Sequence, residues 1–430
     1  MTLALLGFAI VLALAFLGVP LCFAMLCVGV AMFGSVRGIE PALMMAGQTI
    51  SDLAMNEGLS VLPMFILMGA LIYKSDLAEE LYDAAYAVVG HRRGGLAYAT
   101  VLASAGFASI SGSSIATAAT MTKVALPPMR RLHYDDSLAS GCVSSAGTLG
   151  ALVPPSVPLL IYGVVTQQDI AKLFVAGILP GILLGALFMV AIWWTVLRRP
   201  GLGPAGPLLP WPERLRKISK VWGIVLLFVV VMGGLYGGIF TANEAGGVGA
   251  AGALLFTALR RRLSARTLLE SLLEAGKTTA TIFSVAFGGM VFANFVTMSG
   301  LTGSLVSLIG GLHLPVTGII LVIMAIYVVL GSMMETISMM LLTVPVFAAV
   351  LAPLGVSMIW FGIFVAMMIE IGLIHPPIGM NIFMVKTIMP ELSTRTIFAG
   401  TIPFLIANFV ALGLIIAFPA IATWLPSFAR

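Results

Sequence analysis

The chain has 430 residues, of which 60% are hydrophobic and only 9% are charged, and its formal net charge is +5. A soluble domain carries about 25% charged residues, so this composition excludes a protein whose surface faces water. The modest positive charge also excludes the dense basic face of a nucleic-acid-binding protein.

Long charge-free runs are the main feature of the chain. A membrane-crossing helix needs about 20 predominantly apolar residues, so these runs predict an all-α polytopic membrane protein. Runs without Asp, Glu, Lys or Arg cover residues 1–36, 141–168, 173–197, 221–243, 278–334, 336–369 and 396–429.

The first of these runs, residues 1–36, is not typical of a cleavable signal. It has no basic residue before its apolar stretch, and that stretch is far longer than about 15 residues. We expect a retained segment, either one kinked span or two short ones. Cys22, Cys27 and Cys142 lie in apolar runs without a CxxC spacing, which indicates small packing residues rather than metal ligands or a disulfide.

Two stretches mix charges with apolar residues in a way that favours amphipathic helices. They cover residues 76–89 and residues 264–277. Helices of this kind lie in the headgroup plane, where they could brace a fixed frame around a moving part. Ordinary loop helices are the alternative interpretation.

Residues 94–128 are apolar but are interrupted at Ser111–Ser114 by Gly and Ser. Each arm beside the interruption has about 17 residues, or about 25 Å of helix, which is marginal for a full crossing. Basic pairs stand at both ends, at residues 92–93 and 130–131. If both pairs are cytoplasmic, the segment enters and leaves on one side and forms a re-entrant helical hairpin.

The next apolar stretch, residues 137–165, is interrupted by Gly150, Pro154 and Pro155. Proline removes a helix hydrogen bond and clashes with the preceding turn. The stretch is therefore predicted to be a discontinuous helix. Broken backbone inside a bilayer is tolerated only where protein or water satisfies it.

Both features recur in the second half of the chain. Gly112, Ser113, Thr117 and Met121 match residues 331, 332, 336 and 340 at a constant offset, and a second Pro-Pro pair follows at residues 376–377. The repeat predicts a second re-entrant hairpin at about 314–353 and a second discontinuous helix at about 356–386.

Charge gives the two halves opposite character. The first hairpin is bracketed by cations, whereas the loops around the second, near residues 311–315 and 350–353, have none. Equivalent loops of different charge indicate an inverted-topology repeat with about 10–12 membrane segments. We expect one repeat at 1–199, a cytoplasmic linker at 200–220 and the other repeat at 221–430.

Half-helix ends that meet inside a membrane are suited to ions, because unwound carbonyls ligate Na⁺ and half-helix N-termini attract a carboxylate. We therefore expect one cation site per half. Nearby hydroxyl groups could add ligands or touch a substrate; the alternative is helix packing by small residues. These hydroxyls belong to Ser111, Ser113, Ser114, Thr117, Thr148, Ser156, Ser332 and Thr336.

Three acids and one histidine stand in apolar surroundings and are functional candidates on that ground. Glu335 lies four residues past Gly331. It could contact the substrate directly, or it could instead act in gating, in coupling or as a structural hydrogen-bond partner. Glu244 follows Thr241 at a helix start, where capping is the commoner role. Glu370 lies in the second discontinuous helix. His375 could face an ion or bond freed carbonyls.

An enzyme is the alternative from another functional class. An intramembrane hydrolase would have to pair Ser111 with His375 across the halves, without a G-x-S-x-G motif around the serine. The chain also has no HExxH motif, and its four histidines have no metal-site spacing. The sequence therefore favours a transporter.

The strings GFASISGSSIATAATM and GTLGALVPPSVPLLIYG, with GGIFTANEAGGVGA and IGLIHPPIGMNIF in the second half, resemble the large membrane subunit of tripartite ATP-independent periplasmic (TRAP) transporters. The resemblance covers essentially the whole chain. It implies a Na⁺-coupled elevator-type carrier of the inner membrane that imports an organic acid, with no cofactor besides the coupling ion. It also implies a separate small four-helix membrane subunit and a periplasmic substrate-binding protein.

The same resemblance suggests site residues. A first Na⁺ site would use Ser111, Gly112, Ser113, Gly150, Val153 and Pro155. A second would use Gly331, Ser332, Gly372, His375 and Ile378, where His375 replaces the Thr usual in the family. Candidates that face the substrate are Ser114, Thr117, Thr148, Pro154, Ser156, Glu335, Thr336 and Pro377. The acid could be a C4-dicarboxylate, a sialic acid, a sugar acid or a keto acid, and a self-sufficient Na⁺/carboxylate symporter is the alternative.

Overall fold

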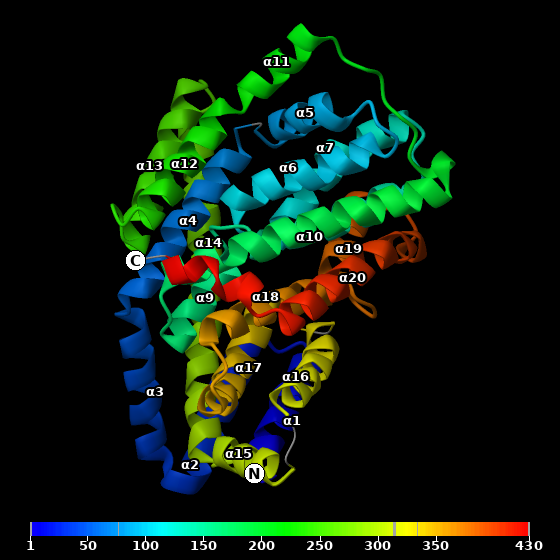
Figure 1. Cartoon of the computed structure of the whole chain (residues 1–430). Coiled ribbons are helices and arrows are strands. Elements are labelled where there is room, and N and C mark those ends of the chain that lie inside the picture. Colours follow the sequence, from blue (N-terminus) through cyan, green and yellow to red (C-terminus); the bar gives the residue numbers. More distant parts are fainter. Residues whose placement is uncertain (1, 76, 313–314, 333, 429–430) are drawn as a thin grey trace.

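The computed structural model describes residues 2–75, 77–312, 315–332 and 334–428. Every regular element in these ranges is a helix, which confirms the all-α prediction (Figure 1). Asp76 and Leu314, the expected starts of one amphipathic helix and of the second hairpin, lie outside these residues, as do the two chain ends.

The first half contains the first hairpin (α6 and α7) and the first discontinuous helix (α8, η1 and α9), followed by one long helix. Its elements are α1 (Thr2–Phe16), α2 (Leu21–Arg37), α3 (Ile39–Ala54), α4 (Glu57–Tyr73), α5 (Leu77–Val89), α6 (Gly95–Ser111), α7 (Ser114–Arg131), α8 (Asp136–Ala146), η1 (Gly147–Ala151), α9 (Val157–Thr166) and α10 (Ile170–Arg198).

The second half repeats this order, with the second hairpin (α16 and α17), the second discontinuous helix (α18 and α19) and long α20. Its elements are η2 (Pro200–Leu202), α11 (Trp211–Lys220), α12 (Trp222–Tyr236), α13 (Ala242–Leu259), α14 (Ala265–Met298), α15 (Leu301–Leu312), α16 (Val316–Gly331), α17 (Thr336–Leu351), η3 (Ala352–Leu354), α18 (Met358–Ile374), α19 (Met380–Ile388), α20 (Thr394–Ala417), α21 (Ala420–Thr423) and η4 (Leu425–Phe428).

Helix length and composition identify the membrane segments. Among the described residues, four helices are long and apolar enough to cross a bilayer, namely α10, α14, α17 with η3, and α20. The number rises to six if the bent pairs α3–α4 and α11–α12 each form one span. Further apolar helices of 10–17 residues include α6, α9, α16 and α18. They are the short arms and broken pieces that the interruptions predict.

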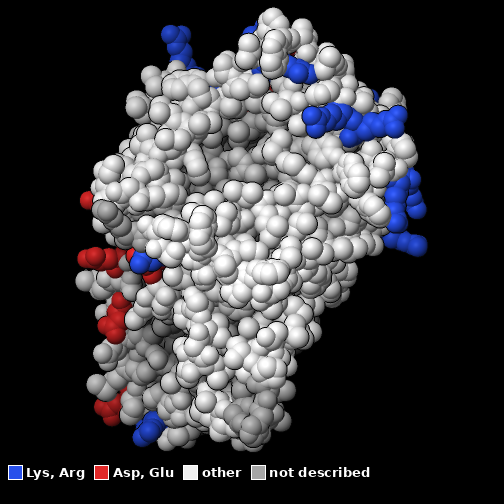
Figure 2. Space-filling model, viewed as in Figure 1, with Lys and Arg blue, Asp and Glu red and all other residues white. Residues whose placement is uncertain are grey.

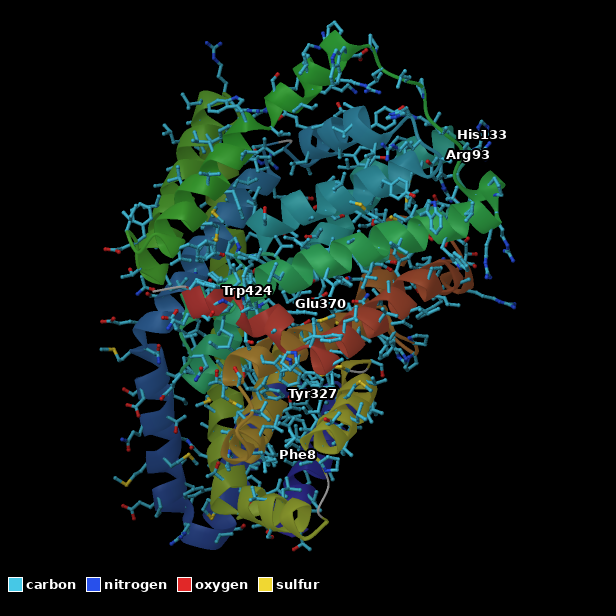
Figure 3. The ribbon with its side chains drawn as sticks, in the orientation of Figure 1. Phe8, Arg93, His133, Tyr327, Glu370 and Trp424 are labelled. Atoms are coloured by element: carbon cyan, nitrogen blue, oxygen red, sulfur yellow. The ribbon has the colours of Figure 1, made fainter. Side chains whose placement is uncertain are left out.

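Helix α18 lies at the centre of the molecule and explains how the halves are joined. Every residue from Trp360 to Ile374 is buried, as expected for a helix that is apolar on all sides. It packs against α9 and α10 of the first half and α16, α17 and α20 of the second. The hydroxyl of Tyr162 on α9 donates to the carbonyl of Met358, at 2.6 Å. Figure 3 places Glu370 of this helix inside the bundle.

Small residues allow other helices to approach closely. A side chain on Gly141 of α8 would overlap the backbone of Gly400 on α20, and one on Gly400 would overlap the backbone of Ser137 on α8. In a bilayer the hydrophobic effect does not drive helices together, because lipid is as apolar as their side chains. Membrane helices therefore associate through close packing at small residues. Long α10 and α20 also pack together, with the rings of Phe188 and Phe404 edge to face at 5.5 Å.

The two stretches predicted to form amphipathic helices differ in structure. Residues 77–89 form the separate helix α5, which packs against α6. Residues 265–277, expected to form a separate helix in the headgroup plane, are instead the first turns of the 34-residue α14. That expectation was wrong because no proline separates the polar turns from the apolar ones that follow, and a single glycine, Gly276, is tolerated inside a helix.

The charge distribution is uneven over the surface. On the visible face most Lys and Arg side chains gather at the top and right, whereas the acids lie along the left edge (Figure 2). The cytoplasmic position of residues 200–220 and the opposite orientation of the two halves stay predictions.

Candidate functional site

The first tip, Ser111–Ser114, is a sharp break between α6 and α7. Gly112 has a φ of +58° and a ψ of 8°, the left-handed conformation that glycine adopts without strain. Ser113 is extended and caps α7, since its hydroxyl accepts from the backbone N–H of Ala116 at 3.3 Å. The hydroxyls of Ser111 and Thr117 are 3.0 Å apart. The tip thus gathers several oxygens at a helix N-terminus.

The first discontinuous helix lies directly against this tip. The backbone N–H of Val157 donates to the carbonyl of Gly112 at 3.4 Å. A Cβ on Gly112 would lie 2.7 Å from the carbonyl oxygen of Pro155, and one on Gly150 would lie 3.2 Å from the Ser113 carbonyl carbon. The structure therefore brings Gly112, Ser113, Gly150 and Pro155 together, as predicted for residues of one site.

The second tip comprises Gly331, Ser332 and Glu335. Here Gly331 is still helical, and it is in backbone contact with Gly372 of α18, where a Cβ would overlap the Gly331 carbonyl. Glu335 caps α17, because its Oε2 accepts from the backbone N–H groups of Ile337 and Ser338 at 3.1 and 3.2 Å. Ser332 donates to the carbonyl of Val329 at 2.8 Å. Tip and broken helix thus meet in both halves, but through different contacts.

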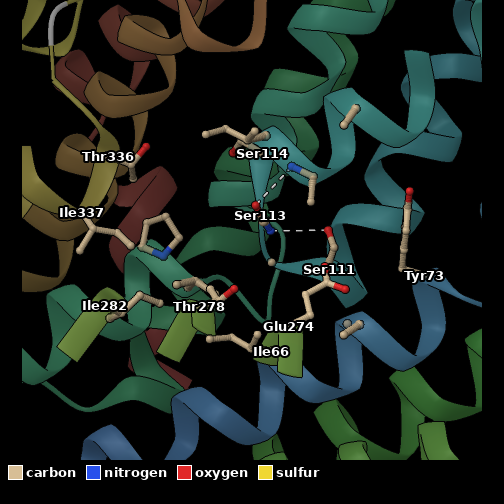
Figure 4. Close-up of a pocket in the computed structure, with 18 of the residues that line it drawn as sticks. Ile66, Tyr73, Ser111, Ser113, Ser114, Glu274, Thr278, Ile282, Thr336 and Ile337 are labelled. Atoms are coloured by element: carbon tan, nitrogen blue, oxygen red, sulfur yellow. Dashed lines mark hydrogen bonds between the residues drawn. The ribbon is translucent and has the colours of Figure 1, made fainter. Parts of the chain in front are cut away.

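A cavity of about 550 Å³ lies between the two tips. Ser111–Ser114 form one wall, and Glu335, Thr336 and Ile337 come from the second hairpin. In Figure 4, Thr336 and Ile337 face the serines of the first tip, with Thr278 and Ile282 of α14 below them. The N-terminal ends of α7 and α17 therefore border the same space.

The described cavity lining contains acidic side chains but no Lys or Arg. These acids are Glu274, Glu335 and Glu370. Glu274 lies on exposed surface of α14, Glu335 is half-buried and Glu370 is 1% exposed. An anion in this space would therefore need positive charge from helix N-termini or from cations.

Ser114 and Glu370 connect the halves across the cavity. The Ser114 hydroxyl donates to Oε1 of Glu370 at 2.5 Å, while Oε2 is buried without a hydrogen-bond partner among the described residues. A buried carboxyl with a single partner is costly and is usually functional in a membrane protein.

The other predicted residues are not part of the described cavity lining. Thr148 and Ser156 are buried and donate to backbone carbonyls of Ser145 and Ala151, at 2.7 and 2.6 Å. Val153 is half-buried and Ile378 is exposed. Pro154–Pro155 and Pro376–Pro377 are joined by cis peptide bonds.

Two ambiguous residues have clear local partners. Glu244 and Thr241 form a reciprocal capping box at the start of α13, so the capping interpretation is confirmed. The His375 imidazole contacts the carbonyl of Pro376, which fits the second of its two predicted roles. The Ser111 hydroxyl is partnered by Thr117, and the lining that contains Ser111 does not include His375, so the hydrolase pair is not formed.

Part of the lining was missed by sequence reasoning. Ile66, Gly69 and Tyr73 come from α4, and Glu274, Thr278 and Thr281 come from α14. The polar residues of α14 recur at i, i+4 and i+7, a spacing that places them on one helix face. This was the available signal, hidden because the stretch was interpreted as a surface helix.

Comparison with known proteins identifies the family to which this chain is similar. The family model "Tripartite ATP-independent periplasmic transporter, DctM component" matches residues 8–421. The C4-dicarboxylate TRAP transporter large permease protein DctM of Pseudomonas aeruginosa is 37% identical over 373 residues, 86% of each chain. The 2,3-diketo-L-gulonate TRAP transporter large permease protein YiaN of Escherichia coli is 31% identical over 94% of each chain.

The chain is also similar to a further permease in sequence and to a solved transporter in structure. The sialic acid TRAP transporter large permease protein SiaM of Vibrio cholerae is 30% identical over 96% of each chain. Among solved structures, the YdaH transporter of Alcanivorax borkumensis, described as having an unusual topology, superposes with a TM-score of 0.62 over 89% of each chain at 14% identity. The last similarity concerns the fold alone.

Proposed function

Because this chain belongs to the family of DctM components of tripartite ATP-independent periplasmic transporters, and is thus a large multi-pass permease of the bacterial inner membrane, we propose that it is the membrane subunit of a Na⁺-driven, binding-protein-dependent importer of an organic acid. A periplasmic binding protein would deliver the acid, and a small four-helix subunit would complete the membrane complex. The class of acid extends over those named for the relatives, from C4-dicarboxylates to sialic acids.

The observation that carries the proposal is the acidic lining of the cavity between the tips. Its lining has three glutamates and no Lys or Arg among the described residues. An organic acid would be repelled there unless cations and helix N-termini offset the carboxylates. Coupling to Na⁺ supplies those cations, and the starts of α7 and α17 supply the two helix termini.

The cations would be held where each tip meets its discontinuous helix. In the first half we assign Ser111, Gly112, Ser113, Gly150, Val153 and Pro155, and in the second Gly331, Ser332, Gly372, His375 and Ile378. Unwound backbone supplies carbonyl oxygens, the donors suited to Na⁺ at such breaks. Ser114, Thr336 and Glu335 line the cavity and would be nearest to the substrate, with Thr117, Thr148, Pro154, Ser156 and Pro377 behind them.

Transport would follow the elevator principle. The two hairpins and the two discontinuous helices contact one another through the Gly112–Val157 backbone bond, the Gly331–Gly372 contact and the Ser114–Glu370 bond. A unit joined in this way can move as one body. Helices α4 and α14 pack against each other and would belong to the frame along which it moves.

The proposal is tested by uptake into proteoliposomes that contain this chain. With radiolabelled succinate and N-acetylneuraminate as probes, each supplied with a matching loaded binding protein, accumulation should require an inward Na⁺ gradient, the small subunit and the binding protein together. Omission of any one should reduce uptake to background.

The controls separate the alternatives. A K⁺ gradient of equal size should not replace Na⁺. Full uptake of free substrate without binding protein would instead identify a self-sufficient symporter. Accumulation that is indifferent to the Na⁺ gradient would contradict both.

A further inference from the structure

Helix α11 carries an apolar stripe that no described element covers. Trp211, Leu215 and Ile218 are 67%, 57% and 37% exposed, and their i, i+4, i+7 spacing places them on one face. The same ten residues contain Arg214, Arg216, Lys217 and Lys220 against one acid, Glu213. A basic amphipathic helix of this composition is typical of a segment that lies in the membrane interface.

The position of α11 in the chain agrees with such a location. It is followed after one residue by the apolar helix α12, and the two are bent by 43° at that break. Four cations in ten residues cannot enter the hydrocarbon core, so the bend separates a helix at the membrane surface from one inside the membrane. Figure 1 shows α11 projecting beyond the end of α12.

Attachments to α5 and to the turn that follows it determine which side of α11 remains free. Lys217 pairs with Asp83 at 3.2 Å, and Arg214 lies 3.3 Å from the imidazole of His91. Both cations are on one flank, so the protein occupies that flank and leaves the stripe beside it uncovered. The side chains of Arg216 and Lys220 take part in no ion pair within the described ranges.

A second basic segment lies next to the end of α11. The guanidinium of Arg260 donates to the backbone carbonyl of Lys220 at 2.9 Å. This contact brings residues 260–262, all arginines, beside Lys220. Arg260 itself pairs with Glu80. On α11, Arg216 and Lys220 accompany the apolar stripe, which is the combination that an anionic phospholipid satisfies with its headgroup and its acyl chain.

We propose that α11 is a binding surface for anionic phospholipids of the cytoplasmic leaflet. Trp211, Leu215 and Ile218 enter the acyl region, and Arg216 and Lys220 hold the headgroups. The helix then anchors the connection between the two halves to the membrane surface. This assignment does not depend on the substrate or on the coupling ion.

The test uses the full chain in nanodiscs of phosphatidylcholine with a minor fraction of phosphatidylglycerol, in which one lipid or the other carries bromine on its acyl chains. Bromine quenches nearby tryptophan, and the difference between the native chain and Trp211→Phe isolates Trp211. We expect quenching by both lipids, and about twofold more per brominated molecule from phosphatidylglycerol, since the basic residues enrich it locally. Raising the salt concentration should remove the excess.

Two comparisons control the result. Arg216→Gln with Lys220→Gln should abolish the preference for phosphatidylglycerol while Trp211 stays quenched. The difference signal of Trp424→Phe should show no preference, because Trp424 is similarly exposed, at 56%, in a stretch, residues 418–428, without Lys or Arg.

Two results would overturn the proposal. Absence of Trp211 quenching would mean that the stripe lies off the membrane or under another protein. Equal quenching by both lipids in the native chain would mean that no headgroup is selected. Both readouts come from the native chain and the conservative, exposed Trp211→Phe change, so neither depends on the folding of the charge variants.

Discussion

The hydroxyl of Ser114, on the first hairpin, donates a 2.5 Å hydrogen bond to Oε1 of Glu370, on the second discontinuous helix, 256 positions away in the chain. Both side chains are buried, and both line the cavity between the tips. The bond therefore joins one moving element of each half at the place where we expect the substrate to bind.

Ser114→Ala should destabilise the protein by about 1–3 kcal/mol, because it leaves Glu370 with neither oxygen bonded in a buried position. The free energy of unfolding in detergent, measured by denaturant titration, checks this value. Combining it with Glu370→Met should recover most of the loss, since removing both polar partners is far cheaper than removing one.

Ser140→Ala is a suitable control, because that buried hydroxyl donates to the carbonyl of Asp136 within its own helix. It should change stability by less than Ser114→Ala does. A double variant as unstable as Ser114→Ala alone would show that the cost has another origin.

Gly372→Ala should weaken the apparent affinity for Na⁺ without preventing insertion. Its Cβ would overlap the carbonyl of Gly331 and push the second tip away from α18. Each 1.4 kcal/mol of lost binding free energy corresponds to about a tenfold weaker apparent Na⁺ affinity in uptake assays. Gly185→Ala, on α10, is the matched control, because nothing lies within 4 Å of its added Cβ. Unchanged Na⁺ affinity in Gly372→Ala would argue against the second cation site.

Gly112→Val should abolish uptake while the protein still inserts. The residue has a φ of +58°, and an added Cβ would lie 2.7 Å from the Pro155 carbonyl oxygen. A left-handed conformation costs a non-glycine residue about 1–2 kcal/mol, and a β-branched one more. Surface expression by immunoblot separates insertion from transport. Native uptake in this variant would refute the assignment of the first tip.

The ion pairs of Arg130 should stabilise the fold mainly at low salt. It forms ion pairs with Asp136 and with Glu391, both at 2.7 Å, and so ties α7 to α8 and to the loop before α20. Because Arg130 is 30% exposed, we expect Arg130→Gln to cost only about 1 kcal/mol. Thermal unfolding of Arg130→Gln at low and high salt tests this expected loss of stability, with Arg131→Gln as the control. An Arg130→Gln deficit that persists in high salt would contradict an electrostatic origin.

The sequence predicted the hairpins and discontinuous helices because their interruptions are local. The interruptions at Gly112, Pro154–Pro155 and Pro376–Pro377 follow from the backbone preferences of glycine and proline, although another pair, Pro127–Pro128, lies inside α7. The expected boundaries agree with the structure within a few residues: α6 and α7 run from Gly95 to Arg131, against the predicted 94–128. The repeat then placed the second copy by analogy.

The cavity lining from α4 and α14 could not be predicted in the same way. The spacing of Glu274 and Thr278 places them on one helix face but does not show what that face contacts. They line the cavity because α14 packs beside α4 and reaches the hairpins. The contact between Gly331 and Gly372 was also hidden, since it depends on how two helices approach and not on the conformation of either glycine. Such features belong to packing between segments that are distant in the chain.

The bonds that cross from one half to the other have a consequence for how the protein can be assembled. Tyr162 bonds to Met358, and Asn381 donates to the carbonyl of Ser144 at 3.1 Å, in addition to the Ser114–Glu370 bond. Neither half is thus complete alone: if the gene were cut within residues 203–210, which form no regular element, each product would leave buried polar groups exposed to lipid until it met the other. Two such fragments produced together should find each other, whereas either one produced alone should be degraded.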